Sequence, residues 1–187
     1  VQEVDAVSRI VVLGTGIVGS AAAWDLVERG HEVVAGDADP EAVRRIAAEL
    51  EVEAHQVDAA DGDAVAALLR GAAAVISGVP YRHGSELAEA ALDAGCHYLD
   101  FGGNPTVVAR QLQLDESARG NNISIIPDCG LAPGLSNVLA AGDIEELGDG
   151  PIDSAAMRVG ALPTEPIGAL GYQLTFSPAG LINEYAE

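Results

Sequence analysis

Three glycines near the start of the chain have the Gly-X-Gly-X-X-Gly spacing of a phosphate-binding turn. They directly follow Arg9-Ile-Val-Val-Leu13, a short apolar run typical of a buried strand, and they precede an Ala-rich segment typical of a helix. In such a turn the first glycine permits the bend, the second lets a pyrophosphate approach the backbone, and the third lets helix and strand pack closely. The N–H groups at the start of the helix attract the anion. The predicted phosphate-binding residues are Gly14, Gly16, Ile17, Val18 and Gly19.

A carboxylate follows this motif at a distance typical of dinucleotide-binding units. Asp37 lies 18 residues after Gly19, close to the ~20 residues expected of a carboxylate that accepts hydrogen bonds from the adenosine ribose. The same charge repels a 2′-phosphate and no Arg follows it directly, so we expect NAD, with NADP less favoured. A glycine turn without any ligand is the alternative. Val79 and Pro80 are predicted to pass beside the nicotinamide ribose, and Asp58 either lies near the adenine or is a solvated turn residue.

Four polar residues lie at the end of a predicted strand or a few residues beyond it, and are candidates for chemistry on a substrate. They are Tyr81, His83, Asp100 and Cys129. Ligands of doubly wound sheets bind outside the carboxyl ends of the strands, so these residues are expected to face one crevice. Tyr81 and His83 are candidate acid–base groups, or simply solvated loop residues. Asp100 and Cys129 either line the substrate pocket or serve capping and packing.

The remaining titratable residues give no further catalytic pattern. Cys96 and His97 lie at the start of the fifth predicted strand, away from the crevice, and are interpreted as structural. The two cysteines lie far apart without a CxxC spacing, and no triad, carboxylate pair or metal-ligand spacing is present, so no metal site is predicted.

Strand and helix patterns alternate over the first part of the chain and must position these residues. The predicted strands lie near 9–14, 31–36, 53–57, 73–79, 96–101 and 123–127, and the predicted helices near 19–29, 39–50, 63–69, 85–94 and 104–120. Because parallel neighbours require a crossover helix, this order predicts an α/β fold with a doubly wound parallel Rossmann sheet.

The pattern changes after Gly134. A connecting helix is predicted over Leu135–Leu147, followed by strands over Ala155–Leu162 and Tyr172–Ser177. Alternation in the last strand favours an antiparallel sheet of a second α+β domain. We therefore predict a Rossmann domain over 1–134, a connecting helix and linker over 135–150, and the beginning of an incomplete substrate or dimerisation domain over 151–187.

The composition is strongly acidic. Asp and Glu total 29 against 9 basic residues, all of them Arg, for a formal net charge of −20. Depletion of basic residues favours a protein of a salt-loving, haloarchaeal source, and an ordinary acidic cytosolic protein is the alternative. The negative charge argues against nucleic acid and anionic membranes as partners. With no membrane-length apolar run and no basic signal segment, we expect a cytoplasmic protein.

Two longer motifs resemble the saccharopine dehydrogenase family, especially its lysine 6-dehydrogenase-like branch. They are Tyr98-Leu-Asp-Phe-Gly-Gly-Asn-Pro105 and Ile126-Pro-Asp-Cys-Gly-Leu-Ala-Pro-Gly134, and segments 9–19 and 176–185 also fit. The resemblance implies NAD(P)-dependent oxidation at a C–N bond of an amino acid such as lysine or saccharopine, through an imine, in a homodimer. It matches Gly14, Gly16, Gly19 and Asp37 to cofactor positions, and segments 100–104 and 129–134 to walls of the substrate cleft.

The absence of Lys is a departure from that family, because its fungal lysine-forming members use a Lys/His acid–base pair. Two alternatives therefore stay open. One is a non-catalytic NAD-sensing Rossmann module of the kind that regulates potassium channels, and the other is a reductase of another substrate on the same scaffold. The Cys-Gly-Leu-Ala-Pro-Gly loop and the strand-rich second part favour the amino-acid dehydrogenase.

We expect the stability of the protein to fall as salt is lowered, because repulsion among its carboxylates is then less screened. The measurement is the melting temperature by circular dichroism in decreasing KCl, with a neutral osmolyte at matched osmolality as the control. A melting temperature that does not depend on KCl would contradict the high-salt interpretation.

Overall fold

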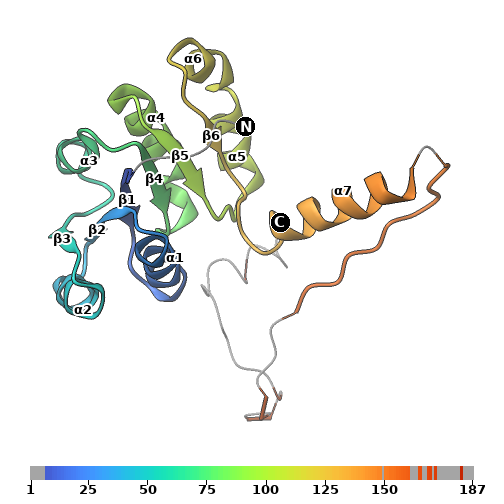
Figure 1. Ribbon diagram of the computed structural model, residues 1–187, viewed down its shortest axis with the longest axis horizontal. Helices are drawn as coiled ribbons and strands as arrows, with labels where there is room; N and C mark the ends of the chain where they lie inside the picture. Colours follow the sequence, from blue (N-terminus) through green and yellow to red (C-terminus); the bar gives the residue numbers. More distant parts are fainter. Residues whose placement is uncertain are drawn as a thin grey trace.

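The computed structural model describes residues 7–148 and 150–160, together with residues 164, 165, 168, 169, 171 and 182. Its strands are β1 (Arg9–Leu13), β2 (Glu32–Asp37), β3 (Glu53–Gln56), β4 (Ala74–Ser77), β5 (His97–Asp100) and β6 (Ile125–Ile126). They form one sheet in the order β3-β2-β1-β4-β5-β6, and every pairing in it is parallel (Figure 1). The chain starts at the centre, runs out to one edge, and returns to run out to the other, which confirms the predicted doubly wound α/β fold.

Helices connect successive strands, and some of them begin where the sequence supplies a side-chain cap. They are α1 (Ile17–Glu28), α2 (Pro40–Leu50), α3 (Gly62–Leu69), α4 (Gly84–Ala94), α5 (Pro105–Leu112), α6 (Asp115–Gly120) and α7 (Leu135–Leu147), with a 3-10 turn η1 (Tyr81–His83) before α4. Asp39 accepts a hydrogen bond from the N–H of Glu41 at the start of α2, and Asn104 accepts two at the start of α5. A proline at the first position of each of these helices lacks an N–H that would otherwise be unpaired.

Two apolar clusters hold helices to the opposite faces of the sheet. On one face, Val12 of β1 and Ala35 of β2 pack with Ala23 of α1 and Ile46 of α2. On the other face, β1, β2, β4 and β5 pack against α3 and α4. Each fully buried Val, Leu or Ile contributes roughly 1.5–3 kcal/mol to the free energy of folding. These clusters therefore fix the positions of the helices relative to the strands.

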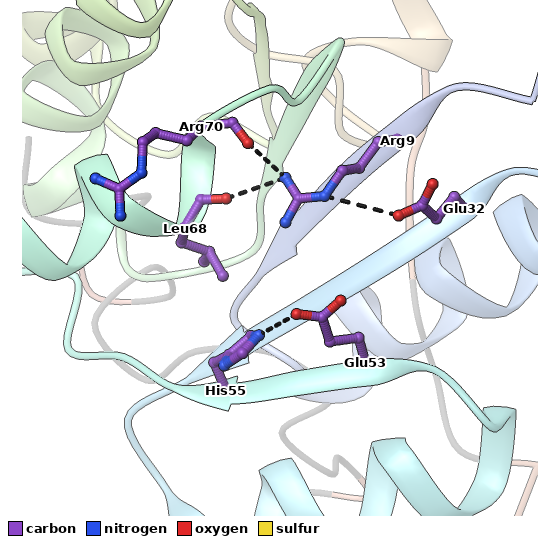
Figure 2. Close-up of polar contacts among 6 residues, drawn as sticks. All are labelled: Arg9, Glu32, Glu53, His55, Leu68 and Arg70. Carbon is purple, nitrogen blue, oxygen red and sulfur yellow. Dashed lines mark hydrogen bonds and ion pairs between the residues drawn. The ribbon is translucent and has the colours of Figure 1, made fainter.

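Arg9 ties the amino-terminal end of β1 to the end of α3 (Figure 2). Its Nη1 donates to the carbonyl oxygens of Leu68 at 3.3 Å and Arg70 at 3.1 Å, and its Nε lies 3.8 Å from the Glu32 carboxylate. The last carbonyls of a helix have no partner within the helix, and a cation stabilises them. This contact therefore supports the crossover helix α3 at the amino-terminal ends of the strands, opposite the end where the glycine turn lies.

One predicted helix is wrong in its extent. The segment predicted as a single helix over 104–120 forms α5 and α6, with a bend at Gln113 and Leu114. The N–H groups of these residues donate to the carbonyls of Arg110 and Gln111, three residues back, which tightens and ends α5. Leu114 then becomes the N-cap of α6.

The connecting helix α7 has the predicted bounds, but the strand predicted after it is wrong over its described part. Residues 155–160 contain no strand or helix, since no neighbouring strand in the described residues pairs with them and an isolated strand is not stable. Residues 161–162 and the predicted strand over Tyr172–Ser177 lie outside the described residues. In Figure 1, α7 extends away from the sheet and residues 150–160 run back beside it. In the described part of the chain, no helix has the length and apolarity needed to cross a membrane.

Candidate functional site

The glycine turn lies between β1 and α1, beside the end of β4, where the order of the sheet reverses. Gly14 has φ +89°, and a Cβ there would lie 2.7 Å from the carbonyl carbon of Gly78 and 2.8 Å from the nitrogen of Val79. A Cβ on Gly19 would overlap the carbonyl oxygen of Gly14. These two glycines therefore let the turn, the helix and β4 approach closely, as the spacing predicted.

The second glycine of the motif faces open space. A Cβ on Gly16 would meet no atom within 4 Å, and Gly16 caps α1 without a side-chain hydrogen bond. Ile17 and Val18 follow it with side chains 84% and 53% exposed. The backbone at the start of α1 is thus accessible, which is the arrangement that a pyrophosphate requires.

Asp37 points at this turn. Its Oδ2 accepts hydrogen bonds from the Thr15 N–H at 2.6 Å and the Thr15 hydroxyl at 2.9 Å, and its Oδ1 accepts one from the N–H of Asp39 at 2.9 Å. The carboxylate expected at the ribose therefore lies against the turn expected at the phosphates.

Three residues of this site were not predicted from the sequence: Thr15, Ser20 and Arg45. Thr15 is 0% exposed, and its carbonyl accepts hydrogen bonds from Ser20 Oγ at 2.8 Å and Arg45 Nη2 at 2.9 Å. The glycine motif leaves the residue between Gly14 and Gly16 unspecified, and nothing in the sequence indicates that an Arg on the next helix reaches it.

The other predicted cofactor neighbours lie at the same edge of the sheet. Val79 and Pro80 directly follow Gly78, whose N–H donates to the carbonyl of Leu13 at 2.7 Å, so they are adjacent to the glycine turn. Asp58 is exposed beyond the end of β3, and its Oδ1 accepts a hydrogen bond from the N–H of Ala60 at 2.9 Å. That geometry is accounted for by the turn alternative, and a contact of Asp58 with the adenine stays a prediction.

Asp100 is the centre of a buried hydrogen-bond network at the ends of β5 and β6. It is 8% exposed, and its Oδ1 accepts from the N–H groups of Gly102 at 2.8 Å and Asp128 at 3.1 Å. Its Oδ2 accepts from the Tyr98 hydroxyl at 2.9 Å and the Gln111 amide at 2.6 Å. Two of these bonds hold the loops after β5 and β6, and the other two tie the carboxylate to β5 and α5. The geometry therefore corresponds to the capping alternative, and a catalytic role for Asp100 stays a prediction.

Two members of this network were not predicted from the sequence. Gln111 is 1% exposed and donates from α5 to Asp100 and to the carbonyl of Gly84, which links α5 to α4. Tyr98 is fully buried in β5; burial, and next the Asp100 carboxylate, raise the pKa of its hydroxyl, which therefore stays a proton donor. A Gln in an amphipathic helix and a Tyr in a strand carry no sequence signal of such a role.

Cys129 is joined to Asp100 by a hydrogen bond between their backbones. Its N–H donates to the Asp100 carbonyl at 2.7 Å, and its thiol lies 3.3 Å from the Ile126 carbonyl. Burial raises the pKa of the Cys129 thiol, and the carboxylates of Asp100 and Asp128 raise it further. The thiol is therefore protonated at neutral pH, and since the thiolate is the nucleophilic form, Cys129 fits a wall of the pocket better than a nucleophile.

Tyr81 and His83 lie in the 3-10 turn after β4, and both are half-buried. A Cβ on Gly103 would lie 3.4 Å from Cδ1 of Tyr81, so the ring of Tyr81 covers the loop after β5. The predicted proximity of the loops after β4, β5 and β6 is therefore observed in the described residues. The acid–base roles of Tyr81 and His83 stay predictions. In the described residues, no group of three His, Cys, Asp or Glu side chains could hold a metal ion.

A parallel sheet of this order, with an accessible glycine turn and a carboxylate against it, defines a dinucleotide-binding Rossmann domain. Residues 10–126 match the family model described as the saccharopine dehydrogenase NADP binding domain. The match covers more than half of the chain and nearly the whole sheet. The chain therefore belongs to the saccharopine dehydrogenase family through its NAD(P)-binding domain, and the predicted resemblance to this family is confirmed. Its place in the lysine 6-dehydrogenase-like branch stays a prediction.

Solved structures share this fold. Saccharopine dehydrogenase (L-Glu forming) from Saccharomyces cerevisiae is 19% identical with a TM-score of 0.65, over 74% of this chain and 31% of that one. UDP-N-acetylglucosamine 3-dehydrogenase from Acidithiobacillus ferrooxidans is 22% identical with a TM-score of 0.58, over 76% and 42% of the two chains. Myo-inositol 2-dehydrogenase from Lactobacillus plantarum is 20% identical with a TM-score of 0.59, over 77% and 42%. The chain thus spans between 31% and 42% of the length of these proteins.

We expect Asp100→Ala to destabilise the protein by about 2–4 kcal/mol, because it leaves buried donors of Tyr98, Gln111 and two backbone N–H groups without their acceptor. Tyr98→Phe removes one of these donors and is expected to cost about 1 kcal/mol. The measurement is urea unfolding at constant high KCl. A loss below about 0.5 kcal/mol for Asp100→Ala, the range of ordinary surface substitutions, would show that the network does not hold the loops.

Proposed function

We propose that this domain binds NAD for an oxidoreductase that acts on a C–N bond of an amino acid, as in lysine or saccharopine dehydrogenases. One observation carries the proposal. In a domain of the saccharopine dehydrogenase family, the Asp37 carboxylate is fixed against an accessible glycine turn. The amino-acid substrate is supported by the two motifs around Asp100 and Cys129, which resemble the cleft walls of that family.

The preference for NAD over NADP follows from charge. Asp37 would face the 2′ position of the adenosine ribose, where a carboxylate accepts hydrogen bonds from hydroxyls and repels a phosphate. The family description names NADP, but a family model describes a shared fold, and the residues near the end of β2 differ between domains that select either cofactor. The proposal for this chain therefore rests on Asp37 itself.

The residues of this chain would bind and orient the reactants, while the nicotinamide, when bound, supplies the acceptor of a hydride. Gly16, Ile17 and Val18 would present backbone N–H groups to the pyrophosphate. Tyr81 and His83 would exchange a proton with the substrate, and the loop carrying Cys129 would form one wall of its pocket. A homodimer and a cytoplasmic location are part of the same proposal and follow from the family resemblance and the composition.

We expect Asp37→Ala to weaken NADH binding by ~1–3 kcal/mol, because ribose hydroxyls and the Thr15 donors lose their acceptor. The measurement is the dissociation constant of NADH in high KCl, followed by energy transfer from Trp24, the single tryptophan of the chain. Asp93→Ala is the matched control. It removes the same charge from an exposed site near the end of α4, at the amino-terminal ends of the strands and therefore away from the glycine turn. Equal affinities for Asp37→Ala and the unaltered chain would remove Asp37 from the cofactor site.

The proposed reaction is tested with the natural full-length polypeptide, NAD and a panel of amino acids that includes lysine and saccharopine, in high KCl. We expect absorbance of the reduced cofactor to appear with one amino acid whose C–N bond is oxidised. If NADH binds but no amino acid is oxidised, the proposed reaction is wrong, and a sensing module or a reductase of another substrate becomes the better interpretation.

A further inference from the structure

Thr15 holds two opposite charges of the cofactor site at once. Its N–H and hydroxyl donate hydrogen bonds to Oδ2 of Asp37, and its carbonyl oxygen accepts a hydrogen bond from the guanidinium of Arg45. We propose that Thr15 is a positioning residue that sets the preference for NAD, by fixing the Asp37 carboxylate toward the ribose and retaining Arg45 away from the 2′ position. This inference rests on the proposed function and extends it to a residue that the glycine motif leaves unspecified.

The first step concerns the free positions on the carboxylate. A carboxylate offers about four lone-pair positions to donors. Three are taken, two on Oδ2 by Thr15 and one on Oδ1 by the N–H of Asp39. Oδ1 is therefore the oxygen that has room for a ribose hydroxyl. Because Thr15 contributes two of the three bonds, it determines which way that oxygen faces.

The second step concerns Arg45. It lies on an exposed position of α2 and places Nη2 2.9 Å from the Thr15 carbonyl, which also accepts from Ser20 Oγ. In domains that take NADP, an Arg near the end of the second strand accommodates the 2′-phosphate. Here the guanidinium of Arg45 donates to the backbone of the glycine turn instead. Its charge stabilises the turn, and the carboxylate charge beside the ribose is left to repel a phosphate.

The third step concerns rigidity. Thr15 is 0% exposed and lies between the two glycines of the turn. The conformation of the turn, which would contact the pyrophosphate, and the orientation of Asp37, which would contact the ribose, therefore depend on one buried residue. A site arranged before binding loses less conformational entropy when the ligand arrives.

The test compares Thr15→Val with Thr15→Ser in the 187-residue chain. Val keeps the shape and the N–H but removes the hydroxyl, whereas Ser keeps both donors. We expect Thr15→Val to weaken NADH binding by about tenfold, the effect of one hydrogen bond to a charged acceptor, and to weaken NADPH binding by less. The ratio of the NADPH dissociation constant to the NADH dissociation constant therefore falls in Thr15→Val. In Thr15→Ser this ratio stays at the value of the unaltered chain. Thr15→Ala provides the same comparison if the Val variant does not fold.

Arg45→Ala tests the second half of the proposal, with Arg44→Ala as the control for loss of one exposed positive charge from α2. We expect Arg45→Ala to weaken NADH and NADPH binding by the same factor, because the turn loses a support that both cofactors use. A selective loss of NADPH binding in Arg45→Ala would show that Arg45 contacts the 2′-phosphate, and would overturn this half.

The outcomes separate this inference from the proposed function. If the unaltered chain binds neither NADH nor NADPH, the proposed function itself is overturned. If it binds NADH and Thr15→Val leaves the ratio of the two affinities unchanged, only the role of Thr15 is overturned. A lower melting temperature with equal loss of both cofactors likewise shows a merely structural role.

Discussion

Three glycines meet backbone to backbone where β1, α1 and β4 converge, and the rest of the cofactor site depends on this contact. A Cβ on Gly14 would strike Gly78, a Cβ on Gly19 would overlap Gly14, and a Cβ on Gly78 would lie 2.9 Å from the Gly14 carbonyl oxygen. Without side chains, the start of α1 comes down onto the ends of the two central strands. The accessible N–H groups of the helix then lie at the point where the sheet reverses, and loops from both halves reach the same edge.

A second constraint operates on the other half of the sheet, and it is polar. The buried carboxylate of Asp100 joins the loops after β5 and β6 by accepting N–H groups from both. Its other oxygen is held by Tyr98 and Gln111, which anchors the loops to β5 and α5. A buried carboxylate is stable only when donors surround it. Gly102 in the same motif has φ +75°, and a Cβ there would overlap the Asp128 carboxylate, so the close approach of the two loops requires a glycine at this position.

The helices and strands could be predicted from the sequence, whereas the long-range contacts of the site could not, for a physical reason. Apolar runs, caps and glycine spacing are local, so the order of strands and helices, the glycine turn and the place of Asp37 could be predicted. Thr15, Arg45 and Gln111 act through contacts with residues far along the chain, and their types carry no periodic signal. The helix bend at Gln113 was missed because both halves have helical patterns. The predicted strand over Ala155–Leu162 is wrong in its described part, 155–160, because a strand is stable only where a partner strand is available.

The charge of the chain adds a last constraint on cofactor binding. A formal net charge of −20 opposes a dinucleotide that is itself an anion. At 1 M salt the Debye length is about 3 Å, so carboxylates scattered over the surface would act only on their neighbours. Binding would then depend on groups close to the ligand: the N–H groups at the start of α1, which Arg45 supports through the Thr15 carbonyl, and the Asp37 carboxylate proposed to face the ribose. If the high-salt interpretation holds, an acidic surface and an anionic ligand are compatible because salt leaves short-range contacts to determine affinity.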